Sequence, residues 1–298
     1  MLNTIIFSKD RACQLEALLR TWTTNVRGVG NQGKTHIIWK ASTPEFELGY
    51  QKLISFYPCS KLFNFIKEES FSEQVCELLE TCNTATDLVM FLVDDIMFKE
   101  PWWLDKELED LLVMSREIFC LSLRLSEHIN YCYPTSSMVI KPSSYVLSGD
   151  YYPYNSLAEF EWKHGEGDWG YPMSLDGHVF RASFIRPIVF KLRKYFNNPN
   201  SLESVLSETC NRGVFDYLPK MLCYHFNSKI INLPANRVQT TCLNKHNDNL
   251  TPEELNKLFV ELNQVVDTDR FNKIKNNSPH MNLPLVLHDD PRSDTMYQ

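Results

Sequence analysis

The sequence predicts an α/β protein built on a mostly parallel central sheet with flanking helices. Short apolar runs alternate with stretches of helical periodicity over the first hundred residues. One of these runs, "DLVMFLV" (87–93), is near-continuously apolar, as in strands that a parallel sheet buries on both faces. After residue 130 the composition shifts toward Tyr, Trp, Pro, Gly and Asn, which favours loops and short strands. These observations predict a layered α/β fold followed by a loop-rich region.

The order of the elements follows from the periodicity. A strand is expected at 4–8. The helix after it has an apolar face at i, i+3, i+4 and i+7, made by Leu15, Leu18, Leu19 and Trp22. Helical stretches separate the further strands that we expect at 35–39, 62–66, 87–93 and 118–125. Near the C-terminus, "TPEELNKLFVEL" (251–262) is predicted to be a helix by its capping box, Thr251 with Glu254, and by the proline at its first position.

Composition limits the class of protein. The chain has 298 residues, of which 43% are hydrophobic, so it can bury a sizeable core. Its 30 basic and 37 acidic residues give a net charge of −7, which argues against a nucleic-acid partner held by bulk electrostatics. Nine cysteines, an odd number without a C-x-x-C pair, argue against a disulfide framework and a structural zinc site. The apolar run near the N-terminus is too short for a signal peptide or a membrane span, so we expect no transmembrane segment and a cytoplasmic protein, or one peripheral to the membrane.

Two adjacent carboxylates, Asp94 and Asp95, end a strand that should be buried, in "FLVDDIMF" (91–98). Ligands of open α/β sheets bind outside the carboxyl ends of the strands. Adjacent carboxylates there are costly unless a positive group neutralises them, and a divalent cation that holds substrate phosphates is one solution. The alternative is an exposed turn or a helix cap that uses one of the two residues.

A glycine-rich stretch, "GVGNQG" (28–33), matches the letters of a dinucleotide-binding motif. That motif must follow a strand and open a helix, whereas this stretch follows a helix and precedes a strand. We therefore predict a connecting loop. The sequence also lacks a P-loop and the G-x-S-x-G motif of α/β-hydrolases.

Several segments together resemble the GT-A class of nucleotide-sugar glycosyltransferases, and more loosely the family-2-like group within it. They are "IIFSKDRACQLEALLRTW" at the first strand and helix, "IIWKAS" at the second strand, "FLVDDIMF" as a variant of the D-x-D motif, and "DWGYPMSLDGHVFR" and "NPNSLE" further on. The match covers roughly residues 1–240. The resemblance implies transfer of a sugar from a UDP- or GDP-sugar to a hydroxyl of a carbohydrate or glycolipid acceptor, assisted by Mn²⁺ or Mg²⁺.

The resemblance also implies roles around the donor. The last Asp of the motif usually binds the metal, which assigns this role to Asp95, while Asp94 would approach the ribose or share the metal. Val93 occupies the first position of the usual triple-acidic form, so this chain has one carboxylate fewer there. The donor would also be bordered from the first two strands by Ser8, Asp10, Arg11 and Lys40.

Two of these donor assignments, and one later residue, have alternatives. Asp10 is expected to bond the base or to cap the first helix. Lys40 is expected to contact the base or ribose or to be merely solvated. His225, in "LCYHF", is either a late metal ligand or a satisfied core histidine.

The stretch "EGDWGYPMSLDGHVFR" (166–181) places carboxylates among aromatic side chains, as acceptor sites for sugars do. An inverting transferase needs one carboxylate to accept the proton of the attacking hydroxyl. Asp176 is the first candidate for this base and Asp168 the second. The alternative is a loop in which Asp176 and Gly177 form a tight turn.

We therefore expect a single GT-A catalytic domain at 1–275, followed by a polar tail at 276–298. Its nucleotide-sugar-binding half would span 1–125, its acceptor-binding half 126–245, and a C-terminal helical segment 246–275. Two other functions stay open: a non-catalytic nucleotide-sugar-binding or scaffold protein of the same fold, and a sugar-phosphate nucleotidyltransferase. The latter should have a Gly-rich loop after the first strand, where "FSKDRACQL" contains no glycine.

Overall fold

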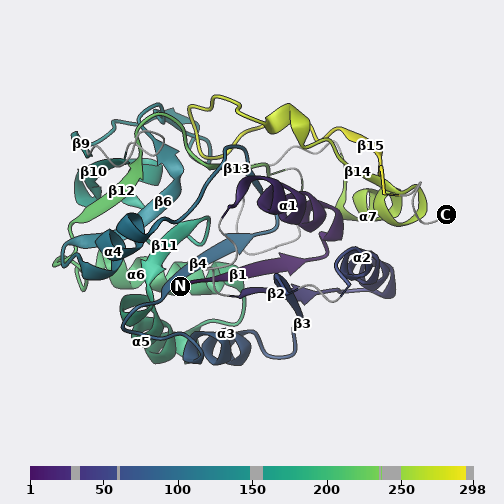
Figure 1. The fold of residues 1–298 in the computed structure, drawn as a ribbon, viewed down its shortest axis with the longest axis horizontal. Coiled ribbons are helices and arrows are strands. Elements are labelled where there is room, and N and C mark those ends of the chain that lie inside the picture. The colour runs from purple at the N-terminus through teal and green to yellow at the C-terminus, as the bar shows by residue number, and fades with distance from the viewer. Residues whose placement is uncertain (28–33, 59–60, 148–156, 235, 237–249, 293–298) are drawn as a thin grey trace.

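The structure is a computed structural model, which describes residues 1–27, 34–58, 61–147, 157–234, 236 and 250–292. The glycine-rich stretch at 28–33 lies outside these residues. Figure 1 shows a central sheet with helices above and below it. The first half of the chain forms β1 (Leu2–Lys9), α1 (Ala12–Asn25), β2 (Thr35–Lys40), α2 (Pro44–Ser55), β3 (Phe63–Lys67), α3 (Phe71–Glu80), β4 (Leu88–Val93), β5 (Ile96–Phe98), α4 (Lys106–Met114) and β6 (Ile118–Ser126).

The second half contributes shorter elements. After the strands β7 (Tyr131–Cys132), β8 (Ser137–Met138), β9 (Ser144–Leu147) and β10 (Leu157–Glu161) come the short 3₁₀ turns η2 (Trp162–His164) and η3 (Gly167–Gly170). The chain continues through β11 (His178–Arg181), α5 (Ala182–Leu192), η4 (Arg193–Tyr195), α6 (Pro199–Asn211), β12 (Lys220–Tyr224) and β13 (Ile230–Asn232). It ends with α7 (Pro252–Glu261), β14 (Gln264–Val266), η5 (Asp269–Phe271) and β15 (Leu287–Asp289).

The central sheet confirms the predicted α/β class. Its strand order is β3-β2-β1-β4-β11-β6-β12-β10-β9. The strands β10 and β11 pair antiparallel with both of their neighbours, while the other pairs are parallel, so the remaining strands all run in one direction. The sheet is therefore mostly parallel, as the alternation of β and α elements predicted.

Alternation along the strands creates two apolar cores, one on each face of the sheet. Ile6 belongs to the core that also contains buried residues of α1, α2 and α7. Its neighbours Ile5 and Phe7 belong to the other core, which contains buried residues of α3, α5 and α6. In Figure 1, α1 lies above the sheet and α3 and α5 lie below it. Successive side chains of a strand point to opposite faces, so a strand that is apolar at every position requires helices on both sides.

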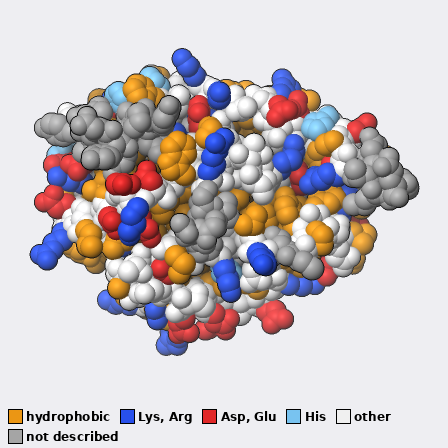
Figure 2. Space-filling model, viewed as in Figure 1, with side chains coloured by type: hydrophobic (Ala, Val, Ile, Leu, Met, Phe, Trp, Pro, Cys, Tyr) orange, Lys and Arg blue, Asp and Glu red, His pale blue; other side chains and the backbone are white. Residues whose placement is uncertain are grey.

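The helix expected near the C-terminus is confirmed. Thr251 caps α7 and accepts a hydrogen bond from the backbone N–H of Glu254, whose side chain in turn accepts from the backbone of Thr251. None of the described helices combines the length and apolar character that crossing a membrane requires. The cysteines in the described part of the chain are free and buried. Figure 2 shows basic and acidic side chains interspersed over one face of the molecule.

Much of the predicted polar tail is packed against the domain. Asn276 and Ser278 are buried, and the backbone of Asn232 exchanges hydrogen bonds with Pro279 and Met281. Further along, β15 pairs with β14. Backbone hydrogen bonds, rather than an apolar face, hold much of this segment, which is why hydrophobic periodicity gives no sign of its packing.

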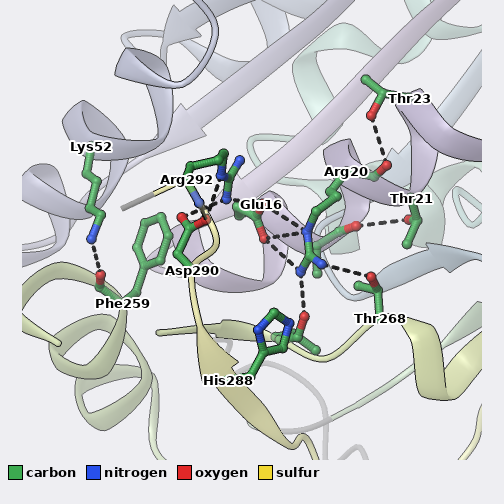
Figure 3. Close-up of polar contacts among 12 residues, drawn as sticks. Glu16, Arg20, Thr21, Thr23, Lys52, Phe259, Thr268, His288, Asp290 and Arg292 are labelled. Atoms are coloured by element: carbon green, nitrogen blue, oxygen red, sulfur yellow. Dashed lines mark hydrogen bonds and ion pairs between the residues drawn. The ribbon is translucent and has the colours of Figure 1, made fainter. Parts of the chain in front are cut away.

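A buried ion cluster joins this segment to α1 (Figure 3). Glu16 on α1 is fully buried. Its carboxylate accepts hydrogen bonds from Arg20, one helical turn away, and from Arg292 at 2.6 Å. Arg20 also donates to the backbone carbonyl of Val266 and to the hydroxyl of Thr268. The N-terminal helix and the C-terminal strands are thus fastened to each other.

Candidate active site

A cavity of about 870 Å³ lies at the edge of the sheet where β1, β2 and β4 end. Ser8 and Lys9 end β1, Lys40 ends β2, and Asp94 directly follows β4, and all four line the cavity. The carboxyl ends of parallel strands are where α/β proteins bind their ligands. Side chains from segments far apart in the sequence line the rest of the wall, among them Arg124, Asp168, Asp176, Glu203, Asn232 and His280.

An arginine neutralises the acidic pair after β4. Arg11 Nη1 lies 3.1 Å from Asp94 Oδ1 and 3.4 Å from Asp95 Oδ2. The other guanidinium nitrogens of Arg11 donate to Asn236. Asp94 Oδ2 also accepts from the backbone N–H of Lys9. The two carboxylates occupy the turn between β4 and β5. Because Asp94 is buried within this turn, neither of the two alternatives, an exposed turn or a helix cap, fits it.

Burial governs the ionisation of Asp94. It raises the pKa of this carboxyl to about 6, although Arg11 acts in the opposite direction. For Arg11, burial lowers the pKa, but Asp94 and Asp95 outweigh this effect and hold it above its ordinary value. The guanidinium therefore remains charged at neutral pH beside the strand end.

Asp95 is the member of the pair that fits a divalent cation. Its contacts with Arg11 Nη1 and Asn232 Nδ2 are both 3.4 Å, which is long, so the carboxylate is loosely held while it lines the cavity. Mg²⁺ is commonly bound through one or two carboxylates together with substrate phosphates. Among the described residues, no group of three or more His, Cys, Asp or Glu side chains forms a metal site.

Ser8 and Lys40, both predicted to border the donor, line the cavity from neighbouring strands. The hydroxyl of Ser8 lies 2.7 Å from the hydroxyl of Tyr50. Lys40 Nζ donates to Glu68 at 2.6 Å, and its side chain is about half exposed. Together with Arg11, they give this end of the cavity a polar wall with basic side chains, and their roles stay predictions.

Asp10 and His225 are not among the residues that line the cavity. Asp10 adopts φ 57°, a left-handed conformation that Asp tolerates, and its carboxylate accepts from the backbone N–H and hydroxyl of Ser42. The first helix has no side-chain cap, so the helix-cap alternative for Asp10 is wrong. The ring of His225 packs against Phe226 at 4.7 Å between centroids, and its buried Nδ1 has no partner among the described residues, so the satisfied-core alternative is wrong as well. Neither placement supports the donor or metal role that the resemblance implied.

Arg124 gathers the predicted acceptor-side carboxylates. Its Nη2 lies 2.5 Å from Asp168 Oδ1, and its Nη1 lies 3.0 Å from Asp176 Oδ2 and 2.7 Å from the hydroxyl of Ser174. Glu203, near the start of α6, lines the same wall and accepts from the backbone N–H of Leu175. One guanidinium thus faces three carboxylates, two from the stretch 166–181 and one from α6.

This environment raises the pKa of Asp176 to about 7. Burial is the main cause of this rise. The guanidinium of Arg124 lowers the pKa, and the neighbouring carboxylate of Glu203 raises it further. Burial likewise raises the pKa of Glu203. A carboxyl that titrates near neutral pH beside a cavity suits proton transfer at physiological pH.

His280 reaches the cluster from the C-terminal segment. Its Nδ1 lies 3.3 Å from Arg124 Nη2, and because a guanidinium can only donate, Nδ1 must accept. The proton of the neutral ring is therefore on Nε2, which faces Asp176 Oδ2 at 3.8 Å. Burial and Arg124 both hold the pKa of His280 well below its ordinary value. His280 thus enters the site as a neutral donor.

Sequence reasoning missed Arg124, Glu203, Asn232 and His280. Arg124 did carry a signal, because it is the single charged residue in the mostly apolar run "IFCLSLRL". Glu203 lies in "NPNSLE", a segment noted for its resemblance but not for a role. His280 and Asn232 carry no local signal, because only the parallel bridge between their backbones brings them together.

Comparison with known proteins adds one relative. No family model matches the chain. The sequence is 27% identical over 307 aligned residues to the bifunctional glycosyltransferase pgtA of Dictyostelium discoideum. The chain is similar to a glycosyltransferase. The alignment covers 96% of this chain but 38% of the relative, so the similarity concerns a part of a longer protein.

Solved structures match more weakly. TarS of S. aureus shares 10% identity at a TM-score of 0.41, over 77% of this chain and 36% of that one. The 4-diphosphocytidyl-2C-methyl-D-erythritol synthase of Anaerococcus prevotii shares 13% identity at a TM-score of 0.37, over 76% of this chain and 86% of that one. Similarities of this size say nothing about the chemistry of the site.

Proposed function

We propose that the chain is a glycosyltransferase that moves a sugar from a nucleoside-diphosphate sugar to a hydroxyl acceptor. The sequence relationship to a bifunctional glycosyltransferase supports the reaction class. The observation that carries the proposal is one cavity with basic residues at the strand ends and a carboxylate of raised pKa on the opposite wall. Its volume of about 870 Å³ is in the range of sites that enclose small ligands.

In this proposal the donor lies along the ends of β1, β2 and β4. Lys9, Arg11 and Lys40 attract its diphosphate, and the Asp94 carboxylate holds the guanidinium of Arg11 in place. Asp95 and the donor phosphates would hold Mg²⁺ or Mn²⁺, which supplies further positive charge to the departing nucleoside diphosphate.

Asp176 is the proposed base of an inverting transfer. Arg124 occupies its Oδ2, while no hydrogen bond from a described residue reaches Oδ1. Oδ1 accepts the proton of the acceptor hydroxyl as that oxygen bonds to the anomeric carbon and the bond from this carbon to the phosphate oxygen breaks. Asp168 is the weaker candidate, because its contact with Arg124 is shorter, 2.5 Å against 3.0 Å for Asp176, so its carboxylate is held more firmly as the counter-charge of this guanidinium.

The test of the donor site compares two neighbouring variants. Asp95→Asn should reduce transfer at least a hundredfold and remove its stimulation by Mn²⁺, with a melting temperature close to that of wild type, because the carboxylate is loosely held. Asp94→Asn should instead lower the melting temperature, because it leaves Arg11 without its nearest buried counter-charge. Full turnover by Asp95→Asn would refute the metal assignment. Binding of nucleotide sugars without any turnover would favour the non-catalytic alternative.

A further inference from the structure

The two ends of the cavity differ in charge. At the strand ends, the basic residues Lys9, Arg11 and Lys40 line the cavity beside an equal number of carboxylates, those of Glu68, Asp94 and Asp95, so the charges balance where an anionic diphosphate would lie. On the opposite wall Arg124 meets Asp168, Asp176 and Glu203, and it ion-pairs with the first two. Both terminal nitrogens of Arg124 are engaged, and its single charge is set against three carboxylates. Among the described residues, this wall therefore has no spare cation for a second anion.

His280 does not change this balance. Its Nδ1 accepts from Arg124 Nη2, so the ring is neutral and carries its proton on Nε2. The basic residues at the strand ends are directed at the donor in the proposed reaction. Of the described residues beside Asp176, a negatively charged acceptor would therefore meet carboxylates and neutral groups, together with an Arg124 that is already paired.

Unmet hydrogen bonds indicate what this wall does accept. Asp168 Oδ2 and Asn232 Oδ1 are buried without a partner among the described residues, and both side chains line the cavity. Asn232 is oriented by its contact with Asp95, because reversing the amide would place two oxygens against each other. Arg124 Nε is a donor without a partner in the same part of the chain. Hydroxyl groups both donate and accept, so they satisfy all three atoms, whereas phosphates and carboxylates only accept.

On the basis of the transferase function proposed above, we propose that the acceptor is a neutral polyhydroxy compound. Acceptors with a phosphate, sulfate or carboxylate near the reacting hydroxyl are rejected. Recognition comes from hydroxyls that donate to Asp168 Oδ2 and Asn232 Oδ1, and rejection comes from like charge at Asp168, Asp176 and Glu203. The discrimination is thus built into the wall and is independent of the donor sugar.

The experiment measures binding directly, without turnover. Methyl glucoside, methyl galactoside and methyl mannoside are each compared with their methyl uronide at pH 7.5 by saturation-transfer NMR, with UDP or GDP present. Within a pair the two ligands differ only in whether C6 is a hydroxymethyl or a carboxylate. We expect at least one neutral glycoside to bind at least tenfold more tightly than its uronide. Equal or tighter binding of every uronide, or no binding by any glycoside, overturns the inference.

A matched pair of variants on α6 tests the cause. Glu203→Gln removes one carboxylate of the wall and keeps an oxygen that can accept from Leu175, so the uronide should gain at least threefold in affinity relative to its neutral partner. Glu208→Gln makes the same change at an exposed position of this helix and should leave the ratio unchanged. An unchanged ratio in a folded Glu203→Gln protein contradicts the charge argument. Failure of every nucleoside diphosphate to bind would instead count against the transferase proposal. The comparison of glycosides with uronides does not require nucleotide binding, so the two failures can be told apart.

Discussion

Individual side chains resolve the problem of placing two carboxylates at the end of a buried strand. Arg11 lies three residues beyond Ser8, just after the strand β1 that neighbours β4. Its guanidinium neutralises Asp94 from within the protein. Asp95 keeps weaker contacts and remains available to a ligand. Identical residues side by side thus differ in their surroundings, because both line the cavity but Asp94 is buried against the arginine while Asp95 is more exposed.

The proposed base gives a prediction of pH dependence. Asp176 must be ionised to accept a proton, and its raised pKa of about 7 means that kcat/KM should increase as the pH rises from 6 to 8 and then level off. Asp176→Asn should lower kcat about a hundredfold and abolish this rise, with little change in the affinity for nucleoside diphosphate. Initial rates across this range provide the measurement, and Asp110→Asn on the exposed surface of α4 is the control. A flat profile for wild type would remove Asp176 from the role.

At the scale of elements, the fold depends on contacts between the two ends of the chain. The first helix is apolar on the side that packs against the sheet, yet it buries Glu16 completely. The arginines that pair with Glu16 come from its own helix and from beyond β15 (Figure 3). A buried carboxylate is stable only with such partners, so the C-terminal segment is needed to complete the packing of α1.

This dependence predicts an effect on stability. Glu16→Gln leaves Arg20 and Arg292 without their shared counter-charge and should lower the free energy of unfolding by about 2–3 kcal/mol. The loss is below that of a fully buried pair, because both guanidinium groups are partly exposed. Glu208→Gln breaks an exposed pair with Arg212 at the same i, i+4 spacing and should change stability by less than about 0.5 kcal/mol. Urea unfolding followed by circular dichroism compares the two, and equal effects would contradict the role of burial.

At the scale of the whole molecule, the cavity is assembled from both halves of the chain. The ends of β1 and β2 provide basic side chains and the end of β4 provides the acidic pair, while Arg124, Glu203 and His280 bring the opposite wall from β6, α6 and the C-terminal segment. A ligand that spans the cavity would therefore contact segments from both halves of the chain. Ligand binding should consequently be visible as global stabilisation.

The corresponding prediction concerns melting temperature. UDP or GDP with Mn²⁺, at about a hundred times the dissociation constant, should add roughly 2.7 kcal/mol of stability and raise the melting temperature by several degrees. The matching monophosphate should have a smaller effect, because it offers one phosphate fewer to Arg11 and the neighbouring lysines. Thermal scans with and without Mn²⁺ separate the metal contribution. No shift with any nucleoside diphosphate would contradict the donor site.

The sequence by itself determined the layered α/β class, the strand that ends at the acidic pair, and the capped helix α7, because apolar periodicity and capping residues act over a few neighbouring positions. It also singled out Asp95 and Asp176, which the fold brings to one cavity. Only the tertiary structure decided that Arg11 neutralises Asp94 and that Arg124, Glu203 and His280 surround Asp176. Such charge pairs depend on which strands become neighbours and how deeply they are buried, and no local pattern encodes a contact between Arg124 and a histidine 156 positions further along the chain.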